Sequence, residues 1–186
     1  PTPRRDGAGL DSKGMGSRRV KLVVSDFHLG KGPYREDGSV NVFEDFRHDP
    51  KLAEFLDYHR AGEYAGAEVE LVVAGDFFNH LQVVGEPEAA LTERVAIEET
   101  EAILRGHPAI FDALAAFAGA PGHSVTFMMG NHDPGLLFEG GRRVVARRVG
   151  GSHRFLLDAY DFDGVHVEHG MQREPLNAFD PGRYLK

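Results

Sequence analysis

Three short apolar segments, each followed by polar residues, dominate the hydrophobic pattern of the chain. They span residues 20–26, 69–76 and 124–131, and each is rich in Val, Leu, Phe or Met. Short apolar runs bounded by Gly and turn residues are typical of strands that are buried on both faces, as in a sheet covered by helices. We therefore predict three central strands.

Segments with helical spacing of apolar residues separate these strands. A helix is predicted over residues 51–59 after a start at Asp49-Pro50, because Pro is favoured in the first helical turn. A longer helical region opens at Glu86-Pro87, and a further helix runs from His107-Pro108 to about Gly119. Strands that alternate with helices indicate an α/β layered sheet.

The C-terminal part of the chain predicts one more helix and two strands. Residues 142–148 form a short basic amphipathic helix, and residues 155–160 and 165–168 form strands joined at 161–164. Asp163-Gly164 is a typical hairpin turn. Residues 1–19, which are interrupted by glycines, are expected to be a flexible lead-in to one domain over residues 20–186.

Composition and charge exclude several classes of protein. The chain has 186 residues, of which 41% are hydrophobic, and its 21 Lys and Arg against 29 Asp and Glu give a formal charge of −8. Collagen-like, low-complexity and broadly disordered chains are excluded. The acidic balance argues against dedicated nucleic-acid binding. Without a run of roughly twenty apolar residues or a secretory signal, we expect no transmembrane segment and a cytoplasmic location.

The polar residues that follow the predicted strands are the candidates for chemistry. The chain has 10 His and no Cys, so a metal would be held by imidazole, carboxylate and amide groups. Ligands of open α/β sheets bind beyond the carboxyl ends of strands. Such donors suit manganese, iron, zinc or magnesium, and a carboxylate such as Asp76 can bridge two cations. The candidates at strand ends are Asp26, His28, Asp76, Asn79, Asn131, His132, Asp133 and His169.

Four of these segments resemble, in order, the motifs of the calcineurin-like metallophosphoesterase family. The motifs D-x-H, G-D, G-N-H-D/E and an isolated H are matched by Ser25-Asp26-Phe27-His28-Leu29, Gly75-Asp76-Phe77-Phe78-Asn79, Gly130-Asn131-His132-Asp133 and Glu168-His169-Gly170. The resemblance covers residues 20–170. It implies the layered α/β sandwich of that family, with the site at the carboxyl ends of strands.

The resemblance also implies a role for each matching residue. Asp26 and His28 would hold a first metal, Asp76 would bridge both metals, and Asn131 and His169 would hold the second. The cofactors would be two divalent ions, manganese, iron or zinc, with a bridging hydroxide as nucleophile. His132 would face the leaving group as a catalytic residue, and Asp133 would orient its imidazole.

The chain departs from the family at the last motif, G-H-x-H, which is absent between Gly170 and Lys186. His166 and His169 are a poor substitute, because residues three apart on a strand face opposite sides. Five of the seven expected ligands are therefore present. Since the chain also begins without Met, we expect it to lack a C-terminal part of the domain. This fragment is then expected to bind metal weakly or not at all, and to be inactive.

The expected activity is metal-dependent hydrolysis of a phosphoester bond in a phosphorylated small molecule, a nucleotide or a lipid-linked substrate. One alternative is a pyrophosphatase of the UDP-2,3-diacylglucosamine type, a branch that usually has Arg where this chain has His132. An alternative of another class is a non-catalytic scaffold on the same fold. The loop 30–47 follows the first ligand pair, and loops so placed often set substrate choice.

Other polar and aromatic residues are given structural roles. Phe77 and Phe78 are expected to shape the mouth of the site, and His80 is assigned either to its rim or to no role. The basic cluster is expected to be a solvated helix face, with a grip on a phosphate as the alternative; it comprises Arg142, Arg143, Arg147 and Arg148. Five histidines are expected to be solvated, namely His48, His59, His107, His123 and His153.

Overall fold

A four-stranded parallel sheet is the centre of the fold. The computed structural model describes residues 18–83 and 92–178. The strands are β1 (Arg19–Val24), β2 (Glu68–Ala74), β3 (His123–Met128) and β4 (His153–Leu156), in the order β1-β2-β3-β4. All three neighbouring pairs are parallel, which confirms the predicted α/β class. The predicted lead-in lies almost wholly outside the described residues.

Helices connect these strands, and they begin where the sequence provides start signals. They are α1 (Asp49–Arg60), α2 (His80–Val83), α3 (Glu93–Gly106), α4 (Pro108–Ala118) and α5 (Glu139–Val149), with short 3-10 helices at Gly62–Tyr64, Pro134–Leu137 and Met171–Arg173. Pro lies in the first turn of α1 and α4. The Thr92 side chain accepts a hydrogen bond from the Val95 amide at the start of α3. The predicted start at Glu86-Pro87 lies outside the described residues.

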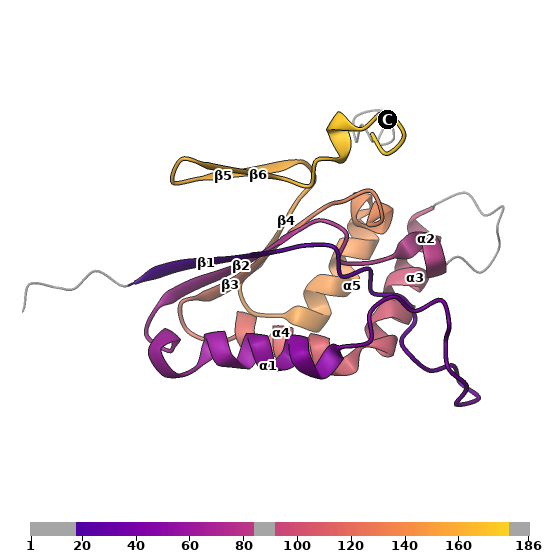
Figure 1. The fold of residues 1–186 in the computed structure, drawn as a ribbon, viewed down its shortest axis with the longest axis horizontal. Helices are drawn as coiled ribbons and strands as arrows, with labels where there is room; N and C mark the ends of the chain where they lie inside the picture. The colour runs from indigo at the N-terminus through magenta and orange to yellow at the C-terminus, as the bar shows by residue number, and fades with distance from the viewer. Residues whose placement is uncertain (1–17, 84–91, 179–186) are drawn as a thin grey trace, which may run out of the picture.

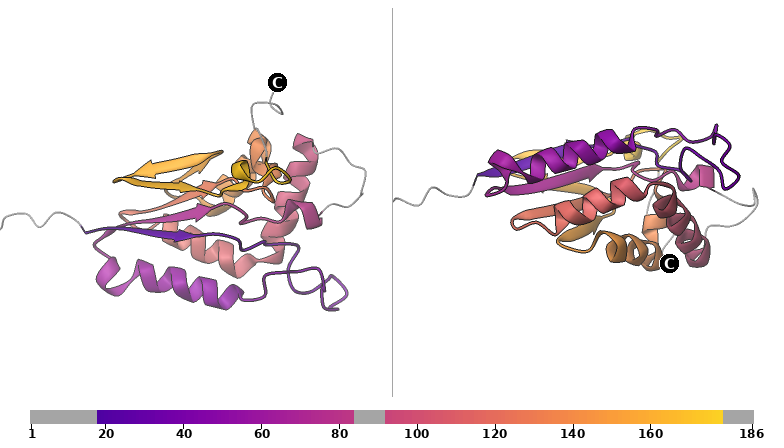
Figure 2. Two further views of the ribbon diagram at one scale, coloured as in Figure 1. Left: turned by 45° about the horizontal axis from the view of Figure 1, so that its top comes forward. Right: turned by 90° about the horizontal axis from the view of Figure 1, so that it is seen from below.

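The helices collect on one face of the sheet because the strand order follows the chain order. Each right-handed crossover then moves in the same direction and leaves its helix on the same side. Figures 1 and 2 show α1 and α4 along that face. The opposite face is covered by an antiparallel hairpin of β5 (Ala159–Phe162) and β6 (Val165–Glu168), seen above the sheet in Figure 1.

Two apolar clusters follow from this layering. The larger lies between sheet and helices, and its largest fully buried side chains include Phe77, Phe78, Phe111 and Phe127. The smaller lies under the hairpin, where Val72, Ala74 and Met128 are packed against partly buried residues of β4, β5 and β6. Phe77 and Phe78 are at most 2% exposed, so the prediction that they shape the mouth of the site is wrong.

The predicted strand over residues 155–160 is wrong, because two strands share this segment. β4 ends at Leu156 in the main sheet, whereas β5 begins at Ala159 and pairs only with β6. Apolar residues continue on both sides of the break, at Leu156, Leu157, Ala159 and Tyr160, so the sequence pattern does not show it. The predicted turn is confirmed, with positive φ at Asp163 (46°) and Gly164 (80°) between β5 and β6.

Three histidines are buried. His107 is 0% exposed and His123 is 3% exposed, so the prediction that they are solvated is wrong. His80 is 1% exposed and lies within hydrogen-bonding distance of Thr100 on α3, beneath the surface rather than at a rim. Over residues 18–83 and 92–178, no helix is long and apolar enough to cross a membrane.

Candidate metal centre

The carboxyl ends of β1, β2 and β3 meet at a cluster of carboxylates and imidazoles. The chain stays paired for a few residues beyond β1 and β2, since the amides of Asp26 and His28 donate to the carbonyls of Gly75 (3.2 Å) and Asp76 (2.9 Å). Asp26, His28 and Asp76 all have positive φ, between 52° and 58°. This conformation costs about 1–2 kcal/mol for a residue with a Cβ, and such strain is concentrated at functional sites.

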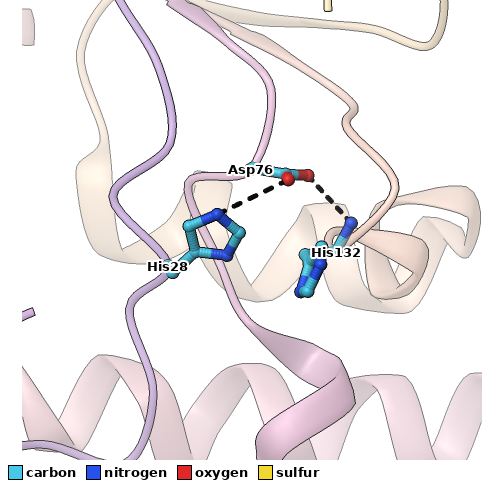
Figure 3. A group of neighbouring side chains, drawn as sticks. All are labelled: His28, Asp76 and His132. Carbon is cyan, nitrogen blue, oxygen red and sulfur yellow. Dashed lines mark hydrogen bonds and ion pairs between the residues drawn. The ribbon is translucent and has the colours of Figure 1, made fainter. Parts of the chain in front are cut away.

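The buried carboxylate of Asp76 is the centre of this cluster. Its side chain is 5% exposed, and its Oδ2 lies 3.6 Å from His28 Nε2 and 3.3 Å from His169 Nε2. Its Oδ1 accepts a hydrogen bond from the His132 amide (2.8 Å). Figure 3 shows Asp76 between His28 and His132, which come from the chain after β1 and after β3. The Asp76 carboxylate is therefore contacted by residues that follow three different strands, β1, β3 and β6.

Two groups of possible metal ligands share Asp76. One is His28, Asp76 and His132, and the other is Asp26, Asp76 and His169; within each group the ligand atoms lie within 4.8 Å of one another. The resemblance implies instead that Asp26 and His28 bind one metal, whereas the structure places them in different groups. The two remain neighbours, with 3.9 Å between His28 Nε2 and Asp26 Oδ1.

The β5–β6 hairpin brings His169 to this centre. His169 directly follows β6, and its ring lies with Nδ1 2.9 Å from the carbonyl of Ala74 at the end of β2. Its Nε2 lies 3.1 Å from Asn131 Oδ1. The contact with Asp76 raises the pKa of His169 to about 9. Because a metal ligand must be a neutral imidazole, cation binding here would release a proton.

Asn79, rather than Asp133, contacts the imidazole of His132. His132 Nδ1 lies 3.0 Å from Asn79 Oδ1, and Asn79 is 1% exposed. Asp133 is directed inward, where its carboxylate accepts hydrogen bonds from the amides of Asp76 (2.6 Å), Phe78 (2.7 Å) and Gly130 (2.9 Å). The prediction that Asp133 orients the ring is wrong, because its oxygens hold the two motif loops together instead.

The buried position of Asp133 also changes its acidity. Complete burial raises the pKa of Asp133 to about 7, although its hydrogen bonds from the three amides work in the opposite direction. Asn79 was visible in the sequence as a polar residue after β2, but nothing in the spacing of the motifs indicated its partner. Its amide group also donates to Asp45 in the loop before α1 (3.3 Å).

A buried ion cluster, absent from the sequence predictions, fixes the loop that follows His28. The Glu44 carboxylate accepts hydrogen bonds from the amides of Gly30 (3.0 Å) and Gly32 (2.7 Å). His107, between α3 and α4, lies 3.3 Å from Glu44 and 2.9 Å from Asp49 of α1. Burial opposes its protonation, but these two carboxylates outweigh burial and raise the pKa of His107 to about 9.

The arginines of α5 are held mainly by contacts within the protein. Arg142 donates to the carbonyls of Leu136 (2.6 Å) and Leu137 (2.8 Å). Arg148 pairs with Asp112 on α4 (2.5 Å), and Arg143 lies 3.5 Å from Glu139. Arg142 and Arg148 therefore tie α5 to its neighbours, whereas Arg143 pairs only within α5. Arg143 and Arg147 are exposed, as the prediction of a solvated helix face expects.

The candidate metal centre combines several kinds of donor atom. Its donors are carboxylate and amide oxygens and imidazole nitrogens, which suit divalent ions of intermediate hardness. No protein-family model matches the chain, and no curated protein matches it.

Proposed function

We propose that this protein is a metal-dependent hydrolase of phosphoester bonds, of the calcineurin-like metallophosphoesterase type. The observation that carries the proposal is the shared position of Asp76 in two groups of possible ligands. A carboxylate has two oxygens and can serve two cations, and paired cations favour an in-line displacement at phosphorus. The substrate classes are phosphorylated small molecules, nucleotides and lipid-linked phosphates.

The packing around Asp76 supports a site built for ligands in fixed positions. A Cβ on Gly130 would lie 2.1 Å from Asp76 Oδ1, and a Cβ on Gly75 would lie 2.5 Å from His169 Nδ1. Any larger residue at either position would displace the carboxylate or the ring. Glycine is therefore required at both positions for a steric reason, since only a residue without a Cβ lets these two side chains approach the backbone so closely.

Two divalent cations fit the chemistry of this donor set. The residues that would hold them are His28, Asp76, Asp26 and His169, together with Asn131. His132, the third member of the first group, is assigned instead to the leaving group. When bound, the cations supply Lewis-acid stabilisation of charge on the phosphoryl oxygens and lower the pKa of a bound water. A buried carboxylate such as Asp76 contributes the negative charge that keeps two cations together.

His132 is the candidate proton donor to the leaving group. Its ring lies 4.6 Å from that of His28, centroid to centroid, so it is beside the ligand cluster. Asn79 holds the Nδ1 side of the ring, which leaves Nε2 as the atom that would give a proton to the departing oxygen. General-acid assistance of this kind contributes roughly 10²–10⁴-fold to the rate.

The proposal is tested by hydrolysis of p-nitrophenyl phosphate and of its bis-ester with manganese, iron(II) or zinc. We expect metal-dependent turnover that falls by about 10³-fold in Asp76→Asn, because several kcal/mol of charge stabilisation depend on the cations. Asp57→Asn, on the exposed side of α1, is the matched control and should behave as the unchanged protein.

Three outcomes separate the alternatives. Turnover only of a nucleoside-diphosphate-linked lipid would favour the UDP-2,3-diacylglucosamine type of pyrophosphatase. Metal bound at two equivalents per chain, without turnover of any ester, would favour a scaffold that uses the same centre for binding. Turnover that survives in Asp76→Asn, or the absence of both metal binding and turnover, would contradict the proposal.

A further inference from the structure

A cavity of about 740 Å³ is lined by the loop that follows His28 and by the end of α3. The loop after β1 forms most of its wall, and the end of α3 with Gln82 of α2 forms the rest. Two lining residues are close in sequence to the centre: Gly30 comes two residues after His28, and Gln82 comes three residues after Asn79. A cavity of this size accommodates a ligand larger than the phosphoryl group alone.

The charge of the cavity is opposite to that of the protein. Lys31, Arg35 and Arg105 line it against one carboxylate, Glu36, whereas the whole chain has a formal charge of −8. Within the described parts of the chain, Lys31 and Arg35 have no ion-pair partner within 4.0 Å. The nearest carboxylate to Arg105 is that of Glu101, at 3.9 Å. Lys31 and Arg35 also favour the ionised forms of two nearby carboxyls. Burial raises the pKa of Glu99 to about 7, a rise that Lys31 opposes, and the pKa of Asp37 is lowered by hydrogen bonds and by Arg35. Because neither cation forms an ion pair with these carboxyls, both can still turn to an anionic ligand.

Two aromatic side chains of the same cavity are exposed. Tyr34 is 67% exposed and Phe43 is 68% exposed, although aromatic rings are normally buried. An exposed aromatic ring offers a large, rigid contact surface to a ligand at low entropic cost. Together with the cations, these rings fit a ligand that combines an aromatic ring with negative charge.

The loop that forms the cavity wall is fixed in place by its own hydrogen bonds. Tyr34 and Val40 form an antiparallel bridge, and the Asn41 amide donates to the Pro33 carbonyl (2.9 Å). The Asn41 side chain donates to the Gly32 carbonyl (3.0 Å). At the base, a Cβ on Gly32 would lie 2.5 Å from the Gly106 carbonyl oxygen, so the loop rests directly on the end of α3.

We propose that this cavity binds the part of the substrate that does not react, and that this part is a nucleotide. The aromatic rings would contact the base, and Lys31, Arg35 and Arg105 would bind a phosphate other than the one at the metal centre. The inference rests on the proposed function and narrows its substrate class to nucleoside di- and polyphosphates and their esters. Charge-assisted bonds to phosphate provide the specificity.

Binding can be measured without catalysis, with the purified chain in excess chelator and N-methylanthraniloyl-ADP as the probe, by fluorescence anisotropy. The double variant Lys31→Gln/Arg35→Gln and the single variant Arg105→Gln should each bind at least about tenfold more weakly, since a hydrogen bond to a charged group contributes about 1.5–3 kcal/mol. Arg94→Gln, on the same helix but outside the cavity lining, should bind normally. Equal affinity of all four proteins, or no binding by any of them, would overturn the inference.

A kinetic comparison then separates this inference from the proposed function. With manganese, the two charge variants should raise KM for ADP hydrolysis about tenfold, whereas Arg94→Gln should leave this KM and the hydrolysis of p-nitrophenyl phosphate unchanged. ADP binding that depends on these cations, in a protein without turnover, would retain the inference and reject the proposed function. If p-nitrophenyl phosphate were hydrolysed and KM for ADP were equal in all variants, the proposed function would be retained and the inference rejected.

Discussion

At the scale of single residues, neighbours in sequence have opposite environments. His132 is half-buried beside the candidate metal centre, whereas Asp133 is 0% exposed and binds only backbone amides. Candidate ligands also differ in exposure: the side chain of Asp26 is 58% exposed, whereas that of Asp76 is 5% exposed. Residue type alone therefore did not indicate which carboxylate serves chemistry and which serves structure.

The role given to Asp133 predicts a loss of stability on Asp133→Asn. An amide has one acceptor oxygen and presents donors on its other side, so at least one of the three backbone amides would lose its partner. Because burial raises the pKa of Asp133 to about 7, removal of the buried charge offsets part of this loss. We expect the free energy of unfolding at pH 7 to fall by about 1–2 kcal/mol, measured by urea denaturation. Asp158→Asn, in the exposed link between β4 and β5, is the control. Unchanged stability in Asp133→Asn would show that its carboxylate does not hold the motif loops together.

At the scale of elements, one loop connects the candidate centre to the helical layer. Glu44 holds the backbone just after His28, and His107 joins that carboxylate to Asp49 at the start of α1. The segment 44–49 thus meets the buried imidazole of His107, which is far from it in sequence. This contact holds the two ends of the loop 30–47, in addition to the hydrogen bonds within the loop.

This ion cluster predicts a pH dependence of stability. Because the folded pKa of His107 is raised from 6.5 to about 9, protonation stabilises the fold fully below pH 6.5, and the benefit is lost as the pH rises through about 9. Unfolding free energies should therefore exceed those of His107→Gln by on the order of 3 kcal/mol at pH 6, and the difference should shrink by pH 9.5.

The exposed His48 offers a matched control, since His48→Gln should follow the unchanged protein across the same range. Urea denaturation at half-unit pH intervals gives the comparison. A difference between the unchanged protein and His107→Gln that stays constant from pH 6 to 9.5 would show that His107 is not protonated in the fold.

At the scale of the whole molecule, a polar network fastens the hairpin layer to the sheet. Glu70 of β2 accepts hydrogen bonds from Lys21 of β1, from Thr126 of β3, from Arg154 of β4 (2.7 Å) and from Tyr160 of β5 (3.1 Å). The Arg154 guanidinium also lies 4.2 Å from the centroid of the Tyr160 ring. Because the hairpin presents His169, this network helps to position that histidine beside Asp76.

Glu70 predicts a loss of stability in acid. Burial opposes its ionisation, but the bonds from Lys21, Thr126 and Arg154 lower the pKa of Glu70 from 4.5 to about 2. The stabilisation is therefore present above pH 4.5 and lost as the pH falls to about 2. Glu70→Gln should be less stable by about 3 kcal/mol at pH 7, with a difference that narrows toward pH 2.

Glu68→Gln, an exposed position of the same strand, is the control for that measurement by chemical denaturation. If Glu70→Gln kept the stability of the unchanged protein at pH 7, the network would not fasten the hairpin. If the difference in unfolding free energy from the unchanged protein narrowed equally for Glu68→Gln, acid unfolding of the whole protein, and not the protonation of Glu70, would be responsible.

Local pattern sufficed for much of the fold. The three central strands, the helix after Asp49 and the turn at Asp163-Gly164 follow from side-chain periodicity, proline at helix starts and residues that accept positive φ. These preferences act between residues close in the chain, so they are visible in sequence. The grouping of Asp26, His28 and Asp76 also followed, because parallel strands present their carboxyl ends at one edge.

Only the tertiary structure decided which side chains meet. Residues 155–160 are divided between the main sheet and the hairpin, so the chain crosses from one layer to the other. This crossing brings His169 to Ala74 and Asp76. The tertiary structure also paired His132 with Asn79 and buried His107 between two carboxylates. Such contacts join positions tens of residues apart, and they depend on how layers pack rather than on the preferences of any one segment.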